Sequence, residues 1–294
     1  MSNDGKVASL YDIFMRAGGR LKRRGRYTLI RLSRPQHRLS AADQIEVLRG
    51  FARETDALYQ ADTSFHWLSR ADYFAGMNDL WSVFLDRELV GFMAVRVFRD
   101  VGERIVYIDN MNIRSIPLLA VGPHTIGSML VHEMLCAHYP FLRQPMSVVF
   151  RTQNPSVYRL AYSILPLSVY PRINGRKPRD EARSVRVARC MAARLSPGKA
   201  YEDVISVIRG AYHGHIYGRP LSLGQGIKPA LSRFWTENVR VDAGDAVLIA
   251  GCLKHEEVRG SVFGYLKALW RQRLSSRREA RIATDATVEI PHHH

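Results

Sequence analysis

The stretch from residue 81 to residue 113 constrains the fold more than any other part of the chain. "WSVFLDRELVGFMAVRVF" consists of two apolar runs on either side of the turn "DRE" at residues 86–88. Two β-rich runs joined by so short a turn predict an antiparallel hairpin. The segment "RIVYIDNMNI" (104–113) follows at once and predicts a third strand. A chain with three consecutive strands must build a sheet and cover it with its remaining elements.

The segments on either side of these strands also carry helix and strand patterns. Before them, "RYTLIRL" predicts a strand, "SAADQIEVLRGFARETDALYQ" predicts a helix with Ser40 as N-cap, and residues 63–80 predict a shorter helical region. After them come a loop and the helix "TIGSMLVHEMLCAHY". The strand "PMSVVFRTQ" and the helix "NPSVYRLAYSI" follow, the latter with Asn154 as N-cap and Pro155 at its first position. "LPLSVYPRI" predicts the last strand.

The predicted order is therefore β, α, α, β, β, β, α, β, α, β from about Tyr27 to Ile173. An antiparallel hairpin that leads into a strand–helix–strand crossover makes a mixed sheet. The predicted fold class is α/β (α+β), with a mixed, mostly antiparallel sheet flanked by helices and a C-terminal α/β extension.

Composition excludes several other classes of protein. The 294 residues are 46% hydrophobic, which is enough for a core and excludes wholesale disorder. Cys136, Cys190 and Cys252 lie far apart, which argues against a disulfide framework or a zinc site of paired cysteines. No segment approaches the ~20 apolar residues of a membrane span, and the first residues lack a signal-peptide pattern. A cytoplasmic location is expected, and the final histidines are typical of a purification tag.

The positive charge is large and clustered. The net charge is +16, with basic residues concentrated in 16–38, 172–195 and 270–281. Such a field attracts polyanions, so nucleic acid or an anionic lipid surface is expected as a partner, unless the charge serves solubility alone. The longer stretch 261–281, which contains the last basic segment, has apolar residues on one helical side: Val262, Phe263, Leu266, Leu269 and Trp270. It predicts either a helix at the membrane periphery or a helix that packs on the core with a solvated basic face.

The C-terminal third carries weaker signals. Residues 184–195 and 200–212 predict helices, and a glycine-rich loop follows. Residues 234–253 predict a strand or a hairpin around Ala243, and the basic segment ends the chain as a helix. His213 and His215 are spaced as a pair of metal ligands, but the sequence offers no convincing third ligand, so no metal is expected.

The order of elements resembles that of the GNAT superfamily of N-acetyltransferases. "VFLDRELVGFMAVRVF" resembles the hairpin of the family, whose second strand starts with a glycine, here Gly91. "HTIGSMLVHEML" resembles the acyl-CoA pyrophosphate loop and its helix, and "NPSVYRLAYSI" resembles the later Asn-initiated helix. The resemblance predicts a GNAT-like acyltransferase core at residues 27–175. Charge and pattern on either side of it predict a basic N-terminal segment (1–26) and a basic C-terminal extension (176–294) that is mostly helical with a short β hairpin.

The resemblance implies a CoA-type cofactor. Acetyl-CoA or a longer acyl-CoA is the expected donor, an acyl-carrier-protein thioester is an alternative, and no metal is implied. The family loop reads Arg/Gln-x-x-Gly-x-Gly/Ala, and here Gly122, Thr125 and Gly127 occupy its three defining positions. Backbone N–H groups at the start of a helix can hold a pyrophosphate. The residues expected there are His124, Thr125, Ile126, Gly127 and Ser128.

Other cofactor contacts are implied by the strand before this loop. In the family it carries a bulge and splays from the next strand, so its free backbone holds the thioester arm. The matching residues here are Met111, Asn112 and Ile113, and Asn154 is a further expected contact. The alternative is that the polar residues simply end the strand, with Thr125 as a plain N-cap and Gly127 as a packing residue. His124 or Arg114 is expected to supply positive charge.

Acyl transfer to an amine also needs a base for the amine and an acid for the leaving thiolate. Asp109 is the candidate base, with His132 and Glu133 as alternatives, although many family members deprotonate the amine through water. The family often places a tyrosine on the late helix near the leaving sulfur. Tyr158 and Tyr162 flank that position and are the candidate acids.

The predicted function is therefore an acyltransferase that moves an acyl group from acyl-CoA, or a related thioester, to an amine-bearing acceptor by direct attack in a ternary complex. One alternative is a non-catalytic GNAT-like module that binds nucleic acid or an anionic membrane through its basic segments. Another is an acyltransferase whose substrate is itself a polyanion.

Overall fold

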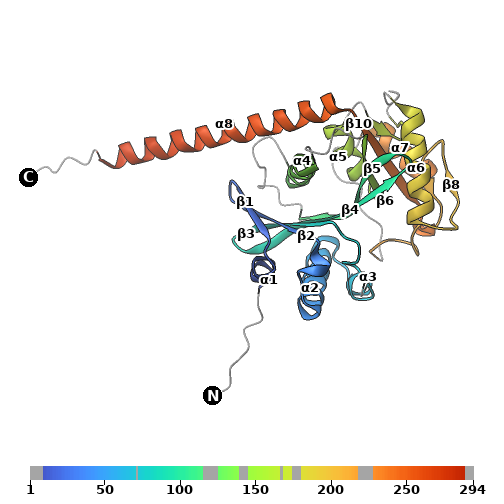
Figure 1. Ribbon diagram of the computed structural model, residues 1–294, viewed down its shortest axis with the longest axis horizontal. Coiled ribbons are helices and arrows are strands. Elements are labelled where there is room, and N and C mark those ends of the chain that lie inside the picture. Colours follow the sequence, from blue (N-terminus) through green and yellow to red (C-terminus); the bar gives the residue numbers. More distant parts are fainter. Residues whose placement is uncertain are drawn as a thin grey trace, which may run out of the picture.

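The structure is a computed structural model that describes residues 9–70, 72–114, 125–138, 145–165, 168–173, 180–217 and 228–288. Within these ranges a ten-stranded sheet runs through the molecule (Figure 1). Its strands, in spatial order, are β1 (Arg20–Arg24), β2 (Tyr27–Ser33), β3 (Asp79–Leu85), β4 (Glu88–Asp100), β5 (Glu103–Ile113), β6 (Met146–Thr152), β10 (Ala246–Leu253), β9 (Val207–Ile208) and β8 (Tyr201–Glu202), and β7 (Val169–Tyr170) pairs with β10. Every described pairing is antiparallel except that of β5 with β6.

Helices cover both faces of the sheet. They are α1 (Leu10–Arg16), α2 (Ala41–Tyr59), α3 (Ser64–Leu68), α4 (Ile126–His138), α5 (Pro155–Ile164), α6 (Glu181–Leu195), α7 (Pro229–Asn238) and α8 (His255–Val288), with short 3-10 turns at Pro35–His37 and Val241–Ala243. One core lies under α4, α5, α7 and α8. On the other face, α1, α2 and α3 cover β2, β3 and β4, while α6 covers the part near β10. Figure 1 shows these two layers on either side of the strands.

The predicted fold class is confirmed: the sheet is mixed, mostly antiparallel and flanked by helices. The hairpin joins β3 to β4 through a two-residue turn in which Asp86 and Arg87 both have positive φ, as a twisted hairpin turn requires. The predicted caps are also present. The Ser40 side chain accepts from the Asp43 N–H, and the Asn154 side chain accepts from the Ser156 N–H.

The two ends of the chain enter the sheet more deeply than predicted. The segment 1–26 contributes α1 and β1, and β1 pairs along its whole length with β2. From the extension 176–294, β10 pairs with β6 from Val247–Thr152 to Leu253–Met146. The expected last strand, β7, pairs with β10 and not with β6. The boundary predicted at residue 176 therefore does not separate two sheets.

Two predictions for the C-terminal third are wrong in detail. Residues 200–212 were expected to be helical, but they contain β8, a turn at Ser206 with positive φ, and β9. Pairing of Val207 and Ile208 with β10 buries both residues and outweighs the helical spacing. A hairpin was expected around Ala243, where the structure has α7, a 3-10 turn and the single strand β10. The short hairpin of this region is β8–β9.

The ring of His138, at the end of α4, is buried near Asp79 and Arg104. Burial lowers its pKa to about 4. His66 is shifted in the same direction for the same main reason. Because the unfolded chain takes up a proton near pH 6.5 and the folded chain does not, the stability from these histidines is complete above that pH. It is lost as the pH falls toward 4.

We therefore expect the free energy of unfolding to decrease from about pH 7 to about pH 5, and to decrease less steeply in His138→Gln. Urea unfolding at both pH values measures this slope. His37→Gln, at an exposed position, is the matched control and should keep the original slope. An unchanged slope in His138→Gln would show that the ring is protonated equally in both states.

Candidate functional site

A cleft opens where β5 and β6 separate. The two strands pair in parallel from Arg104–Met146 to Ile108–Phe150, and there the ladder ends. Beyond that point β5 continues along β4 to Ile113, while β6 continues along β10. Since β5 and β6 turn toward different neighbours, the edge of β5 after Ile108 has no strand partner on this side among the described residues.

A β-bulge lies at the same place. Across from β4, Val95 pairs with Ile108 and Ala94 pairs with Asn110, so Asp109 is the extra residue of β5. A bulge bends a strand and redirects its side chains. Here it coincides with the point at which β5 leaves β6, as the resemblance predicts for the strand that holds a thioester.

The cleft encloses about 550 Å³, counting space open to solvent. Its walls come from β5, β6, α2, α5 and the segment after β9. The lining residues are Tyr59, Ile108, Asp109, Asn110, Met111, Asn112, Phe150, Arg151, Thr152, Gln153, Asn154, Val157, Tyr212, Ile216 and Tyr217. Four predicted site residues are thus brought together: Asp109, Met111, Asn112 and Asn154.

Asp109 carries the negative charge of the cleft. Its Oδ2 accepts from the Arg96 Nε at 3.0 Å, and its side chain is 9% exposed. Arg96 is held in turn by the backbone carbonyls of Tyr73 and Ala75. No described residue donates to Asp109 Oδ1, so one carboxylate oxygen is available to a molecule in the cleft. Arg96 keeps the carboxylate in a fixed orientation.

The end of the cleft toward α2 is closed by amides and phenols. The Asn112 Oδ1 accepts from the hydroxyls of Tyr59 and Tyr217, both at 3.1 Å, and its amide nitrogen donates to Asn110. The two tyrosine rings stack at 4.2 Å. Burial raises the pKa of Tyr217, so its hydroxyl stays protonated. Asn112, predicted as a cofactor contact, uses its side chain to hold this wall, and its backbone faces Phe92 of β4. The backbones of Met111 and Ile113 face the edge of β5 that has no strand partner among the described residues.

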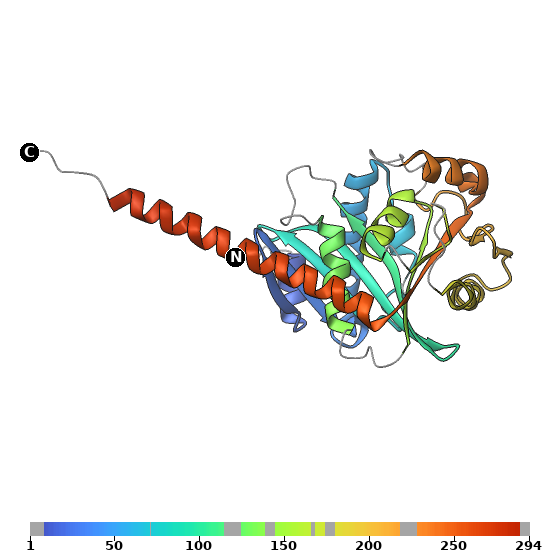
Figure 2. The ribbon, with the colours of Figure 1, turned by 90° about the horizontal axis from the view of Figure 1, so that it is seen from above.

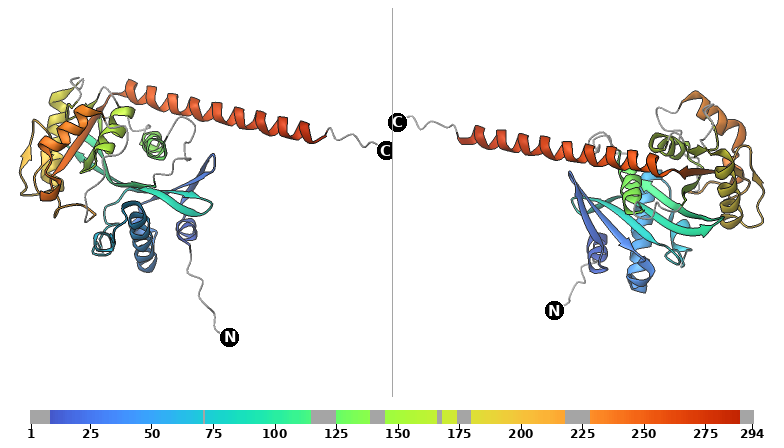
Figure 3. Two further views of the ribbon diagram at one scale, coloured as in Figure 1. Left: turned by 180° about the vertical axis from the view of Figure 1, so that it is seen from behind. Right: turned by 45° about the horizontal axis from the view of Figure 1, so that its top comes forward.

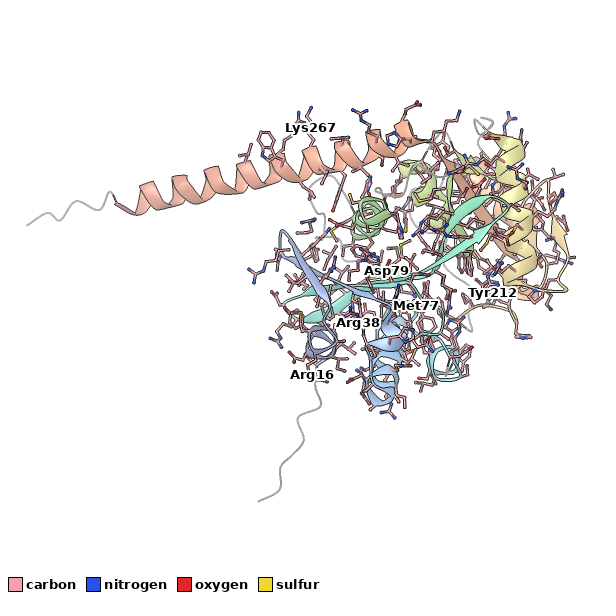
Figure 4. The ribbon with its side chains drawn as sticks, viewed as in Figure 1. Arg16, Arg38, Met77, Asp79, Tyr212 and Lys267 are labelled. Atoms are coloured by element: carbon pink, nitrogen blue, oxygen red, sulfur yellow. The ribbon has the colours of Figure 1, made fainter. Side chains whose placement is uncertain are left out.

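The opposite wall comes from the C-terminal third. The Arg151 guanidinium lies over the Tyr212 ring at 4.7 Å and donates to the Leu195 carbonyl at the end of α6. Figure 4 shows Tyr212 beside the sheet, away from α4 and α8. Gly244 fixes this segment, because it has a φ of +79° and accepts from the Tyr212 N–H at 2.9 Å. A Cβ at Gly244 would lie 1.9 Å from the Tyr212 carbonyl oxygen, so only glycine fits.

The start of α4 lies beside the end of β5. The Thr125 Oγ1 accepts from the Ser128 N–H at 3.2 Å, so Thr125 is the N-cap. A Cβ on Gly127 would lie 3.1 Å from Ile113 Cδ1 and 3.4 Å from Leu160, so the glycine allows close packing against β5 and α5. Ile126 is buried in the core. His124 lies outside the described residues.

Other predicted side chains have structural partners elsewhere. Arg114 forms ion pairs with Glu54 at 2.8 Å and Glu88 at 2.7 Å, so its charge is already balanced. His132 lies at hydrogen-bond distance from the Ser128 carbonyl and the Ser261 hydroxyl. The Glu133 carboxylate accepts hydrogen bonds from side chains of β1 and α8. None of these three side chains lines the cleft.

The two candidate acids do not line the cleft either. The hydroxyl of Tyr158 donates to the Pro171 carbonyl at 3.0 Å, and burial raises its pKa to about 12. The Tyr162 ring lies nearly parallel to the Tyr158 ring, with 6.3 Å between the ring centroids. Three other phenols line the cleft, those of Tyr59, Tyr212 and Tyr217.

The sequence-based interpretation missed these three tyrosines, and also Gln153. Tyr59 ends the helix α2, and the other two lie in a segment whose place in the fold depends on β10. The repeated tyrosines of "AYHGHIYG" were the available signal. The neighbouring His215 contacts Asp242 at 2.7 Å. No group of three metal-ligating side chains occurs in the part of the chain that the structure describes.

No protein-family model matches the chain, and no curated protein sequence matches it. Among solved structures it is similar to the ribosomal-protein-S18-alanine N-acetyltransferase of Escherichia coli, with 11% identity over 77% of this chain and 94% of that one and a TM-score of 0.37. A GNAT family acetyltransferase of Elizabethkingia anophelis with bound acetyl-CoA shows 15% identity over 67% and 88% (TM-score 0.30). An aminoglycoside acetyltransferase from an uncultured soil metagenomic sample shows 14% identity over 47% of this chain and 85% of that one, with a TM-score of 0.32.

The family resemblance drawn from the sequence named a mixed sheet, a bulged strand and a splayed parallel pair. All three are present in this chain, at β5 and β6. The chain therefore has a GNAT-like fold.

Proposed function

We propose that the cleft between β5 and β6 binds an acyl-CoA, or a related thioester, and that the protein transfers the acyl group to an amine. The observation that carries this proposal is the free edge of β5 after Ile108, which adjoins a cleft and the first turn of α4. An extended ligand can pair with such an edge as an added strand would.

The residues of the cleft fit the thioester end of such a donor. Ile108, Met111, Phe150 and Val157 supply an apolar lining for an acyl chain. The backbone of Met111 and its neighbours in β5 offers polar groups to the amide-containing arm and to the thioester carbonyl. The first turn of α4 presents backbone N–H groups at the positive end of a helix, where phosphate is stabilised. When bound, the donor supplies the activated acyl carbon.

We infer that the acceptor amine binds beside Asp109. In the overall reaction a C–N bond forms, the C–S bond breaks, the amine loses a proton and the thiolate gains one. Asp109 Oδ1 attracts the ammonium form and receives one proton from it, directly or through a water molecule, which gives the neutral amine. After this amine attacks the acyl carbon, its nitrogen loses a second proton to water, and the acid protonates the leaving thiolate. Arg96 holds Oδ2, so the free oxygen keeps one direction.

The leaving thiolate needs a proton donor. Among the phenols that line the cleft, Tyr59 and Tyr217 both donate to Asn112 at 3.1 Å. The Tyr212 hydroxyl donates only a long hydrogen bond, at 3.4 Å, to the Arg151 carbonyl. Of the three phenols it therefore has the weakest hydrogen bond within the protein. We assign the acid role to Tyr212 rather than to the buried Tyr158, whose hydroxyl points at Pro171.

Equilibrium binding of CoA and of acyl-CoAs of graded chain length tests this proposal. We expect the wild-type protein to bind at least one of them and Met111→Trp to weaken binding at least about tenfold, because the larger ring fills the cleft. The matched control is Val204→Trp, which adds the same ring at a position that is 91% exposed. Absence of binding by the folded wild type, or equal binding by Met111→Trp, would contradict the proposal.

A further inference from the structure

The helix α8 has an anchored part and an exposed part. Val258, Val262 and Tyr265 are buried in the core, and the Tyr265 hydroxyl donates to Glu133 of α4 at 2.9 Å. From there the helix continues to Val288 and projects well past the body of the protein, as Figures 1, 2 and 3 all show. The projecting part has no described element beside it. None of the described helices, α8 included, is both long and apolar enough to cross a bilayer.

A second apolar stripe runs along the side of α8 that does not face α4. Its members are Phe263, Leu266, Trp270 and Leu274, which are exposed by 56%, 46%, 63% and 45%. They are spaced by three, four and four residues, so they share one face of the helix and span roughly 16 Å along it. Four large apolar side chains in one exposed row form a patch that soluble proteins usually cover.

Basic residues surround this stripe. Between Arg259 and Arg281 the sequence contains seven Lys and Arg residues and a single acidic residue, Glu279. Figure 4 shows Lys267 on the side of α8 that faces away from the sheet. The Arg259 guanidinium lies over the Phe263 ring at 5.7 Å, which places a cation at the margin of the apolar row. The exposed face is therefore apolar in its centre and positive at its sides.

We propose that this face of α8, the stripe Phe263–Leu266–Trp270–Leu274 with its flanking cations, docks on the surface of a bilayer that contains anionic phospholipids. A helix of this kind lies in the membrane interface, with apolar side chains among the acyl chains and cations at the headgroups. Tryptophan favours that depth, because its ring is apolar and its N–H is polar. The proposal concerns a surface outside the cleft and holds or fails independently of the acyl-transfer activity.

Charge excludes the two main alternatives. A second copy of α8 on the same stripe would bring together the cations of residues 259–281 from both helices, and in each copy this stretch contains one acidic residue, Glu279. A nucleic acid would pair with the cations, but its phosphates would leave the four apolar side chains without a partner. An anionic membrane satisfies both the charge and the apolar row.

Tryptophan fluorescence provides a specific test. The chain has four tryptophans, and Trp67, Trp81 and Trp235 are all buried, while Trp270 is exposed. Phosphatidylcholine vesicles with added phosphatidylglycerol should therefore shift the emission to shorter wavelength, and vesicles of phosphatidylcholine alone should not. In Trp270→Phe the protein should still sediment with the anionic vesicles while the spectral shift disappears.

Substitution of the stripe tests the docking itself. Leu266→Ser combined with Trp270→Ser should reduce cosedimentation with the anionic vesicles at least about tenfold, and Phe65→Ser, at an equally exposed apolar residue of α3, should not. Sedimentation velocity and titration with a single-stranded oligonucleotide complete the set. The proposal would be overturned if the protein did not bind vesicles, or if it bound both kinds of vesicle equally. A dimer that depends on the stripe, without vesicle binding, would also overturn it. Oligonucleotide binding that survives the double substitution, with no vesicle binding, would do so as well.

Discussion

Replacement of Asp109 by asparagine is expected to lower kcat/KM for acyl transfer by about 100-fold or more, because a positioned proton acceptor contributes about 10²–10⁴-fold. Asparagine keeps the shape of the side chain and an oxygen that can face Arg96, but it cannot take a proton from the amine. Arg96 also keeps its bonds to the Tyr73 and Ala75 carbonyls, so the bulge should survive. The loss should therefore appear in turnover, with little change in the affinity for the acyl donor.

Thiol release from acyl-CoA, measured with whichever primary amine supports turnover by the wild type, gives the rate. Donor affinity is measured separately by equilibrium binding. The matched control is Asp203→Asn, which changes a partly exposed carboxylate that pairs with Arg189 of α6 and does not line the cleft. Turnover by Asp109→Asn within a few-fold of the wild-type value would show that Asp109 is not the group that handles the amine proton.

Replacement of Glu133 by alanine is expected to lower the free energy of unfolding by about 3–5 kcal/mol, the usual cost of breaking a buried charge pair. Its carboxylate is 1% exposed and joins three elements that are far apart in sequence. Lys22 and Arg24 of β1 contact it at 2.7 and 2.5 Å, and Tyr265 of α8 donates to it at 2.9 Å. Removal of the carboxylate leaves Arg24, which is itself 14% exposed, without its partner.

Chemical denaturation measures this loss, and Glu46→Ala is the matched control. Glu46 pairs with Arg49 on the surface of α2, so its removal should change the free energy by less than about 0.5 kcal/mol. Burial opposes ionisation of Glu133, but Lys22 and Arg24 more than offset it and lower the pKa of the carboxyl. Its contribution is therefore complete above the usual glutamate value of 4.5 and is lost as the pH falls through the lowered folded value.

The difference between wild type and Glu133→Ala should accordingly become smaller in acid. A difference that stays constant below pH 4.5 would show that the carboxylate is not ionised in the folded protein.

Local patterns predicted the centre of the fold well. The turn at Asp86 and Arg87, the cap at Ser40 and the Asn154–Pro155 helix start depend on neighbouring residues, which the sequence displays directly. The bulge and the separation of β5 from β6 followed from the family resemblance. Together these features locate the cleft and bring Asp109, Met111 and Asn154 to it.

Long-range pairing decided what the sequence could not show. The residues around β9 have the apolar spacing of a helix. Val207 and Ile208 form a strand because they pair with β10, some forty residues later in the sequence. The same pairing carries Tyr212 and Tyr217 to the wall of the cleft. Glu133, on the predicted cofactor helix, was an alternative candidate base for which a solvated or core-edge role was favoured. The structure shows it buried, where it binds Lys22 and Arg24 of β1 and Tyr265 of α8.

Hydrogen exchange with and without acyl-CoA tests most directly the claim that the edge of β5 holds a thioester. The amides of Met111 and Ile113 and of the first turn of α4 should exchange more slowly when the donor is bound, while those of the exposed part of α8 should not change. Binding of acyl-CoA without slower exchange at β5 would contradict this placement of the site.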